Sequence, residues 1–252
     1  MPVRPPERAL TIPPALPFRY AMHAATIVWR GQWPQRYWQD TLTEFKGTVN
    51  TLLGPGMRVV EIGARRHPSI APSERPADCF YAALPPRGQG LHNPLPDAFD
   101  SVLTDTRALR GSFALALSYE GLSRARDPRR LVDAAHHLLV PGGRFVAYEP
   151  GVYAPGHWLL RTLPRPARDV VRRHFGKADD EGLVSGCTHS MLAETLSHWE
   201  NVRITPRFLG GRHLRRWRFF RTAYIACEEW AVQSGRTDLA SAYLVTAARP
   251  RT

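Results

Sequence analysis

Short apolar runs occur along the chain, and residues that favour turns separate them. Runs of about five residues that are bounded by Gly and Pro are typical of strands covered by helices on both faces. They predict seven strands, at residues 58–62, 79–84, 101–104, 113–117, 144–148, 202–208 and 243–247.

Helical periodicity fills several intervals between these runs. One helix begins at Asp127-Pro128, where aspartate caps the first N–H groups and proline suits the first turn, and Pro141-Gly142-Gly143 stops it. Its apolar face comprises Leu131, Ala134, Ala135, Leu138 and Leu139. Further helices are expected at about 157–175, 190–199 and 214–234. The three prolines of residues 64–77 favour only a short or broken helix there.

This alternation of strands and helices predicts an α/β fold, a doubly wound and mostly parallel seven-stranded sheet, with an N-terminal helical extension. Residues 1–18 are rich in proline and are expected to form an extended arm. Residues 19–54 form the helical segment, and 55–249 form the main domain, with a helical insertion at about 150–200.

Aromatic residues recur at near-helical spacing in the N-terminal segment. They are Trp29, Trp33, Tyr37, Trp38 and Phe45. Two interpretations are open: the stripe packs on the sheet, or it covers a substrate pocket. Pro34 interrupts the pattern and is expected to start a second helix.

The net charge of +12 admits three interpretations. The first is a solvated surface encoded by an arginine-biased genome. The second is attraction to an anionic substrate or membrane surface, for which the basic cluster 212–221 is the candidate. Nucleic-acid binding is the least favoured, because it requires basic residues gathered on one face with aromatic residues for stacking.

The three cysteines are far apart and form no CxxC pair. This spacing argues against a disulfide framework or a cysteine zinc site and favours a reducing, cytoplasmic location. No apolar run approaches the roughly 18 residues of a membrane span, and the proline-rich N-terminus does not resemble a signal peptide. The adjacent His136 and His137 point to different sides of their helix, so we expect no metal site.

The segment Glu61-Ile62-Gly63 ends the first predicted strand, shortly after a Gly54-Pro55-Gly56 turn. Nucleotide-like cofactors bind at the carboxyl ends of strands in open α/β sheets. The chain resembles the class I S-adenosylmethionine-dependent methyltransferase family in the order of this motif, the acidic residue after the third strand, the loop after the fourth, and the Pro-Gly-Gly turn before the fifth. The resemblance covers roughly residues 45–248.

The chain is also similar to one bacterial subgroup of that family, through Cys187-Thr-His-Ser190, Glu228-Glu-Trp-Ala-Val232 and Tyr243-Leu-Val245. The resemblance implies the Rossmann-like methyltransferase fold and S-adenosyl-L-methionine as cofactor. It also implies methyl transfer to a small-molecule, glycan or lipid-linked acceptor.

The resemblance places the cofactor at the ends of the first, third and fourth strands. It implies that Glu61 orders the loop and helps to hold the cofactor's amino-acid end, and that Asp105 accepts from the adenine amine. Glu120, after the fourth strand, and His189 are the candidate catalytic bases. The cofactor-binding candidates are Glu61, Gly63, Ala64, Arg65, Asp105, Thr106, Ser118 and Tyr119.

Several residues depart from the family pattern, among them Ser123 and Arg124 in the segment after the fourth strand, which often reads Leu-Glu-His in this family. Arg65 and His67 stand where the first motif usually has glycine, and Pro85 stands where a carboxylate usually holds the ribose. Arg65 either crowds the cofactor or pairs with its carboxylate. Two alternatives therefore stay open: a catalytically inactive binding module, and a basic peripheral binder of membrane or nucleic acid that uses the cluster 212–221.

Overall fold

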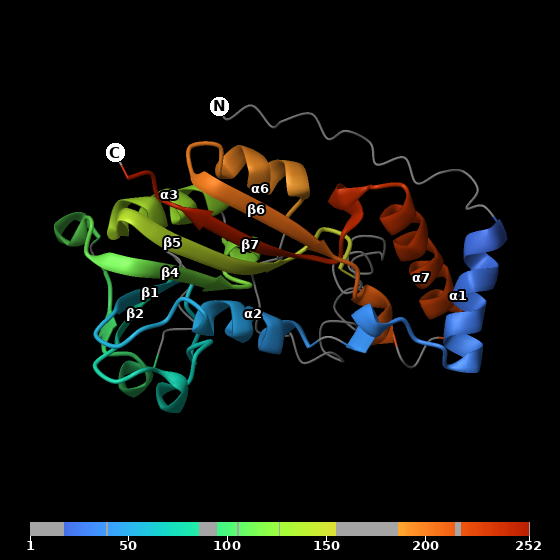
Figure 1. Cartoon of the computed structure of the whole chain (residues 1–252), viewed down its shortest axis with the longest axis horizontal. Helices are drawn as coiled ribbons and strands as arrows, with labels where there is room; N and C mark the ends of the chain where they lie inside the picture. The colour runs from blue at the N-terminus through green and yellow to red at the C-terminus, as the bar shows by residue number, and fades with distance from the viewer. Residues whose placement is uncertain are drawn as a thin grey trace, which may run out of the picture.

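The computed structural model describes residues 18–38, 40–85, 95–104, 106–125, 127–154, 186–214 and 218–251. Seven strands form a single sheet at the centre of the molecule (Figure 1). They are β1 (Arg58–Ile62), β2 (Phe80–Leu84), β3 (Ser101–Val102), β4 (Phe113–Tyr119), β5 (Leu139–Pro150), β6 (Glu200–Arg207) and β7 (Ala242–Ala248).

The strand order is β3-β2-β1-β4-β5-β7-β6. Strands β1 to β5 pair in parallel, whereas β7 runs antiparallel to both of its neighbours, β5 and β6. β6 therefore runs in the same direction as β1 to β5, and all six carboxyl ends lie at one edge of the sheet. The predicted seven-stranded, mostly parallel sheet is confirmed.

Helices cover both faces of the sheet, which explains why β1 is buried from Val59 to Ile62. On one face, Phe45 and Val49 of α2 (Thr41–Asn50) pack on the sheet, and Asp40 caps this helix by accepting from the Thr43 N–H. On the other face lie α3 (Pro128–Leu138) and α6 (His189–Thr195). Asp127 caps α3 as predicted, by accepting from the Arg130 N–H.

Several boundaries differ from the predicted ones. β5 begins at Leu139 rather than at residue 144, because Leu139 already pairs with Phe113 of β4. The Pro-Gly-Gly turn lies in the irregular start of this strand. The expected helix at 214–234 begins at Arg218 as α7 (Arg218–Gln233), after a 3₁₀ turn at Gly210–Leu214. Only a 3₁₀ turn forms within 64–77, as expected, and the helix expected at 157–175 lies outside the described residues.

The N-terminal aromatic residues do not form one stripe on the sheet. Phe45 packs on the sheet, whereas Tyr37 joins a cluster formed with α7 and α1 (Phe18–Arg30). α1 and α7 lie side by side beyond the end of the sheet (Figure 1). Pro34 starts only a 3₁₀ turn at Gln35–Trp38, and the second helix of this segment, α2, begins later than predicted, at Thr41.

Glu228 connects α7 to the 3₁₀ turn that contains Tyr37. Its buried carboxylate accepts from the Tyr37 hydroxyl at 3.0 Å and from the N–H groups of Gly210 and Gly211 at 2.8 and 3.2 Å. Burial raises the pKa of Glu228 to about 7 despite these donors. The neighbouring Glu229 forms an ion pair with Arg36. Within the described ranges, no helix combines the length and the apolarity that crossing a bilayer requires.

Candidate functional site

The loops that follow β1 and β4 touch each other through their backbones. Gly63 has a φ of 66°, and a Cβ added to it would lie 2.7 Å from the Cα of Gly121. A Cβ added to Gly121 would in turn lie 2.7 Å from the carbonyl oxygen of Ile62. Real Cβ atoms do not come this close to backbone, so both positions require glycine. The missing side chain of Gly63 thus accommodates the β4 loop.

Glu149, near the end of β5, holds the β4 loop in place. Its carboxylate is fully buried and accepts from the Ser118 hydroxyl at 2.6 Å. It also accepts from the N–H groups of Leu122 and Ser123, at 3.0 and 2.9 Å, where the chain turns after β4. Burial raises the pKa of Glu149 to about 7, because the desolvation outweighs these three donors.

Glu149 is not among the predicted catalytic or cofactor-binding residues. A signal was present in the sequence: an acidic residue within a strand that is buried on both faces requires donors from elsewhere in the fold. The donors themselves lie 26 to 31 positions earlier in the chain. Spacing along the sequence therefore does not identify them.

Glu61 lies in β1 and is almost completely buried. Its carboxylate accepts from the Tyr81 hydroxyl at 2.6 Å and from the Ser69 N–H at 3.0 Å. Burial raises the pKa of Glu61 above its ordinary value. The bond to Ser69 ties the loop after β1 back to the strand, which is the loop-ordering role expected for Glu61, whereas its contact with a cofactor stays a prediction.

Glu120 follows β4 in a strained backbone conformation. Its φ is 56°, in the left-handed region that non-glycine residues rarely adopt, and its N–H donates to the Tyr148 carbonyl at 2.7 Å. Its carboxylate forms an ion pair with Arg65, from the loop after β1, and a second with Arg124 at 3.3 Å. The side chain of Arg65 therefore spans the two loops. It is 34% exposed and that of Glu120 is 27% exposed, so this pair remains accessible to solvent.

Aromatic rings lie beside this ion pair. Tyr119 stacks on Tyr148 with ring centroids 5.4 Å apart, and it contacts Phe45 of α2 at 5.3 Å. The guanidinium of Arg65 lies 5.9 Å from the centroid of the Tyr119 ring. Burial raises the pKa of both tyrosine hydroxyls above its ordinary value.

The other predicted site residues have varied surroundings. The N–H groups of Gly63 and Ala64 both donate to the Leu84 carbonyl, at 2.8 and 3.3 Å. Thr106 is half-buried before a 3₁₀ turn, and Asp105 lies outside the described residues. His189 is the first residue of α6, and its ring centroid lies 6.4 Å from that of Tyr243 in β7. In the part of the chain that the structure describes, no three His, Cys, Asp or Glu residues are grouped to hold a metal ion.

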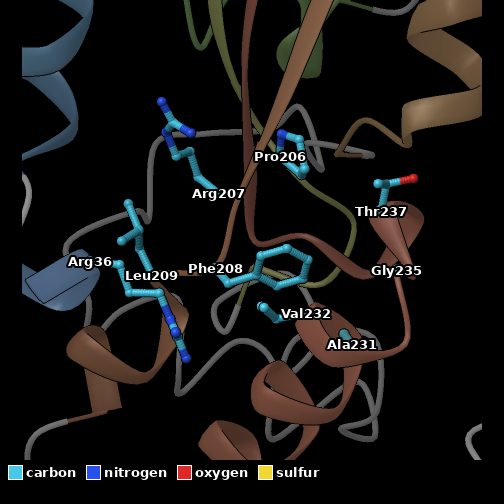
Figure 2. Close-up of a pocket in the computed structure, with 9 residues that line it drawn as sticks. All are labelled: Arg36, Pro206, Arg207, Phe208, Leu209, Ala231, Val232, Gly235 and Thr237. Carbon is cyan, nitrogen blue, oxygen red and sulfur yellow. The ribbon is translucent and has the colours of Figure 1, made fainter. Parts of the chain in front are cut away.

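A cavity of about 450 Å³ lies elsewhere, at the carboxyl end of β6 (Figure 2). Its two arginines are partnered, Arg207 with Glu44 of α2 and Arg36 with Glu229 of α7. β6 lies three positions from β4 in the sheet, which corresponds to roughly 14 Å. This cavity is therefore separate from the ends of β1 and β4. Its lining residues are Arg36, Pro206, Arg207, Phe208, Leu209, Ala231, Val232, Gly235 and Thr237.

No protein-family model and no curated protein sequence matches the chain. Solved structures do match it. The [4+2]-cyclase SpnF aligns with a TM-score of 0.50 and 14% identity, over 83% of this chain and 81% of that one. A putative sarcosine dimethylglycine methyltransferase from Galdieria sulphuraria aligns with a TM-score of 0.48 and 10% identity, over 92% and 98% of the two chains.

Phosphoethanolamine N-methyltransferase 2 from Haemonchus contortus, in complex with S-adenosyl-L-methionine, aligns with a TM-score of 0.49 and 12% identity. The match covers 82% of this chain and 52% of that one, so this chain corresponds to about half of the Haemonchus protein. The chain has the Rossmann-like methyltransferase fold. At these identities the likeness concerns the fold alone, and the activity has to be argued from the site.

We expect Gly63→Ala to destabilise the protein more than Gly56→Ala does. Gly56 has nearly the same positive φ, 67°, but an added Cβ meets nothing within 4 Å there. The control variant Gly56→Ala therefore loses only the stability that alanine costs at a positive φ, about 1 kcal/mol. Gly63→Ala has this cost as well, and overpacking against Gly121 adds about 1–3 kcal/mol. Urea unfolding of both variants measures the difference, and equal losses of stability would contradict the close contact of the two loops.

We expect the stabilities of the wild type and Glu149→Gln to diverge with pH. The pKa of Glu149 is about 7 in the folded protein, against an ordinary value of 4.5. The folded state thus binds this proton more tightly, and Glu149 lowers the free energy of unfolding as the pH rises from 4.5 to 7. Over this pH range, the ionisation of Glu149 lowers the free energy of unfolding by about 3 kcal/mol.

Urea unfolding across this pH range, with both proteins in the same buffers, isolates this contribution because the other titrating groups are common to both. The wild type should lose stability relative to Glu149→Gln as the pH rises. A difference between the two proteins that stays constant with pH would show that burial does not raise this pKa.

Proposed function

We propose that the protein binds S-adenosyl-L-methionine where β1 and β4 end, and transfers its methyl group to a small-molecule, glycan or lipid-linked acceptor. The observation that carries this proposal is the meeting of Gly63, Arg65 and Glu120 at the carboxyl edge of a sheet with this strand order. That edge is where open α/β sheets bind their cofactors.

One unsatisfied donor supports a carboxylate-bearing ligand at this edge. The Nε of Arg65 is buried and has no hydrogen-bond partner among the described residues. Buried donors are nearly always paired in folded proteins, and a guanidinium pairs well with a carboxylate. We therefore assign to Arg65 the amino-acid carboxylate of the cofactor. At the end of β2, Pro85 supplies no carboxylate for the ribose, so the binding depends more strongly on Arg65.

The partly exposed ion pair between Arg65 and Glu120 allows such an exchange. Solvent-exposed ion pairs contribute about 1 kcal/mol or less to stability, and because this pair is partly exposed, a ligand carboxylate can compete with Glu120 for the arginine. Glu120 keeps its ion pair with Arg124 in this exchange and is the candidate general base for an oxygen acceptor. The φ of 56° at Glu120 supports a functional role, because glycine would adopt this backbone without strain.

The cofactor supplies an already activated methyl group, so the protein mainly has to bring the acceptor close and align it. The second candidate function is the catalytically inactive binding module. It is favoured by the same ion pairs, if Arg65, Glu120 and Arg124 stay joined across the two loops and keep the edge closed.

Isothermal titration calorimetry with S-adenosylmethionine and S-adenosylhomocysteine tests the proposal. We expect the wild type to bind both, and Arg65→Ala to bind about 10- to 100-fold more weakly through loss of a charged hydrogen bond. Arg66→Ala, at the exposed neighbouring position, is the matched control and should bind like the wild type. No heat from the wild type at high micromolar ligand would overturn the proposal and favour the inactive module.

Glu120→Gln distinguishes an exchanging ion pair from a fixed one. Without the competing carboxylate, Arg65 is free for the ligand, so we expect S-adenosylhomocysteine to bind as tightly as in the wild type or up to about fivefold more tightly. A clear loss of affinity in this variant would show that the carboxylate of Glu120 contacts the ligand itself.

A further inference from the structure

Helix α1 is apolar on two opposite faces. Phe18, Met22 and Trp29 are spaced by four and seven residues, which places them on one side of the helix. Phe18 is 77% exposed, and each of the other two is 53% exposed. The opposite side packs in the cluster with α7 through Tyr20, Ala24 and Ile27. The packing with α7 thus leaves a second apolar face of α1 on the surface.

Helix α7 extends this surface. Phe219 is 82% exposed, and its ring contacts that of Trp29 edge to face, with centroids 6.0 Å apart. We call Phe18, Met22, Trp29 and Phe219 the aromatic face. Scattered exposed apolar residues are normal, but contiguous large ones on two packed helices mark an interaction surface.

The surroundings of the aromatic face are basic. The guanidinium of Arg218 lies 5.3 Å from the centroid of the Trp29 ring. The sequence contains no Asp or Glu at 18–39 or at 201–227, whereas these two segments together carry ten arginines, of which Arg36 and Arg207 form ion pairs with Glu229 and Glu44. The only acidic residues of α7 are Glu228 and Glu229, and both are buried. The surface that α1 and α7 present is therefore positively charged as well as apolar.

We propose that the aromatic face docks on the surface of an anionic lipid bilayer. Trp, Phe and Met side chains enter the boundary between headgroups and acyl chains, while arginines beside them pair with lipid phosphates. A second copy of the chain would bring arginines against arginines, which is unfavourable. A nucleic acid would be held through its phosphates by the arginines and would make no use of Phe18 and Met22. The combination of charge and apolar area thus favours the bilayer.

This surface lies at a defined end of the molecule. β6 ends at Arg207, and the 3₁₀ turn at Gly210–Leu214 that follows packs against α7. α7 and α1 therefore lie beyond the carboxyl edge of the sheet (Figure 1). Docking through the aromatic face would bring that edge towards the lipid surface.

Co-sedimentation of the full chain with phosphatidylcholine vesicles, with and without phosphatidylglycerol, tests the proposal. We expect binding to the anionic vesicles only, and weaker binding at high salt. The double variant Trp29→Ser/Phe219→Ser should lose at least about tenfold in partitioning. Arg218→Gln should lose about fivefold.

Matched controls are available on the sheet. Val202→Ser removes an apolar side chain of β6 that is 38% exposed, and Arg144→Gln removes an exposed arginine at the opposite edge of the sheet. Both should bind like the wild type. Thermal unfolding of every variant shows whether the fold is intact, and Phe219→Ser alone is available if the double variant unfolds.

Four results would overturn the proposal. They are equal binding to neutral and anionic vesicles, no binding to either, unchanged binding by a folded Phe219→Ser variant, and retention on DNA without retention on vesicles. A dimer that forms without lipid and is lost in the same folded variants would assign the aromatic face to a second copy instead.

Discussion

The contact between the backbones of Gly63 and Gly121 is the constraint on which the arrangement of the site depends. It joins the loops after the two central strands, β1 and β4, and neither residue tolerates a side chain there. Glu149 holds the second loop by accepting from two of its N–H groups. Together, these two contacts fix the position of Glu120 relative to Arg65. A change at either glycine would therefore be transmitted to the charged residues of the edge.

The carboxylates at this edge differ in how accessible they are to a ligand. Glu61 and Glu149 are buried and accept several hydrogen bonds each, so they hold the loops in place. Glu120 is partly exposed and pairs with Arg65 across the two loops. A ligand can exchange partners with this partly exposed ion pair, whereas displacing a buried carboxylate would leave polar groups unsatisfied. The chemistry we propose is therefore confined to Arg65 and Glu120.

A second polar network supports the other end of the molecule. Glu228 accepts from Tyr37 and from two backbone N–H groups ahead of α7, so that the first helices are joined to the last one. Glu228 and Glu229 of α7 are buried, and Glu229 pairs with Arg36 rather than with Arg218 beside the aromatic face. The same arrangement thus stabilises the packing of α1 on α7 and leaves its surface positive.

The amino-acid sequence was sufficient to predict the seven strands, their alternation with helices and the helix start at Asp127, because these depend on local periodicity and on caps within a few residues. It also located Gly63 and Glu120 at strand ends. Only the folded chain shows that Gly63 faces Gly121, that Glu149 binds the β4 loop and that Arg65 pairs with Glu120, 55 positions away. It shows equally that one side of α1 is buried and the other exposed. Such contacts join residues far apart along the chain, and they form only when folding brings the ends of different strands together.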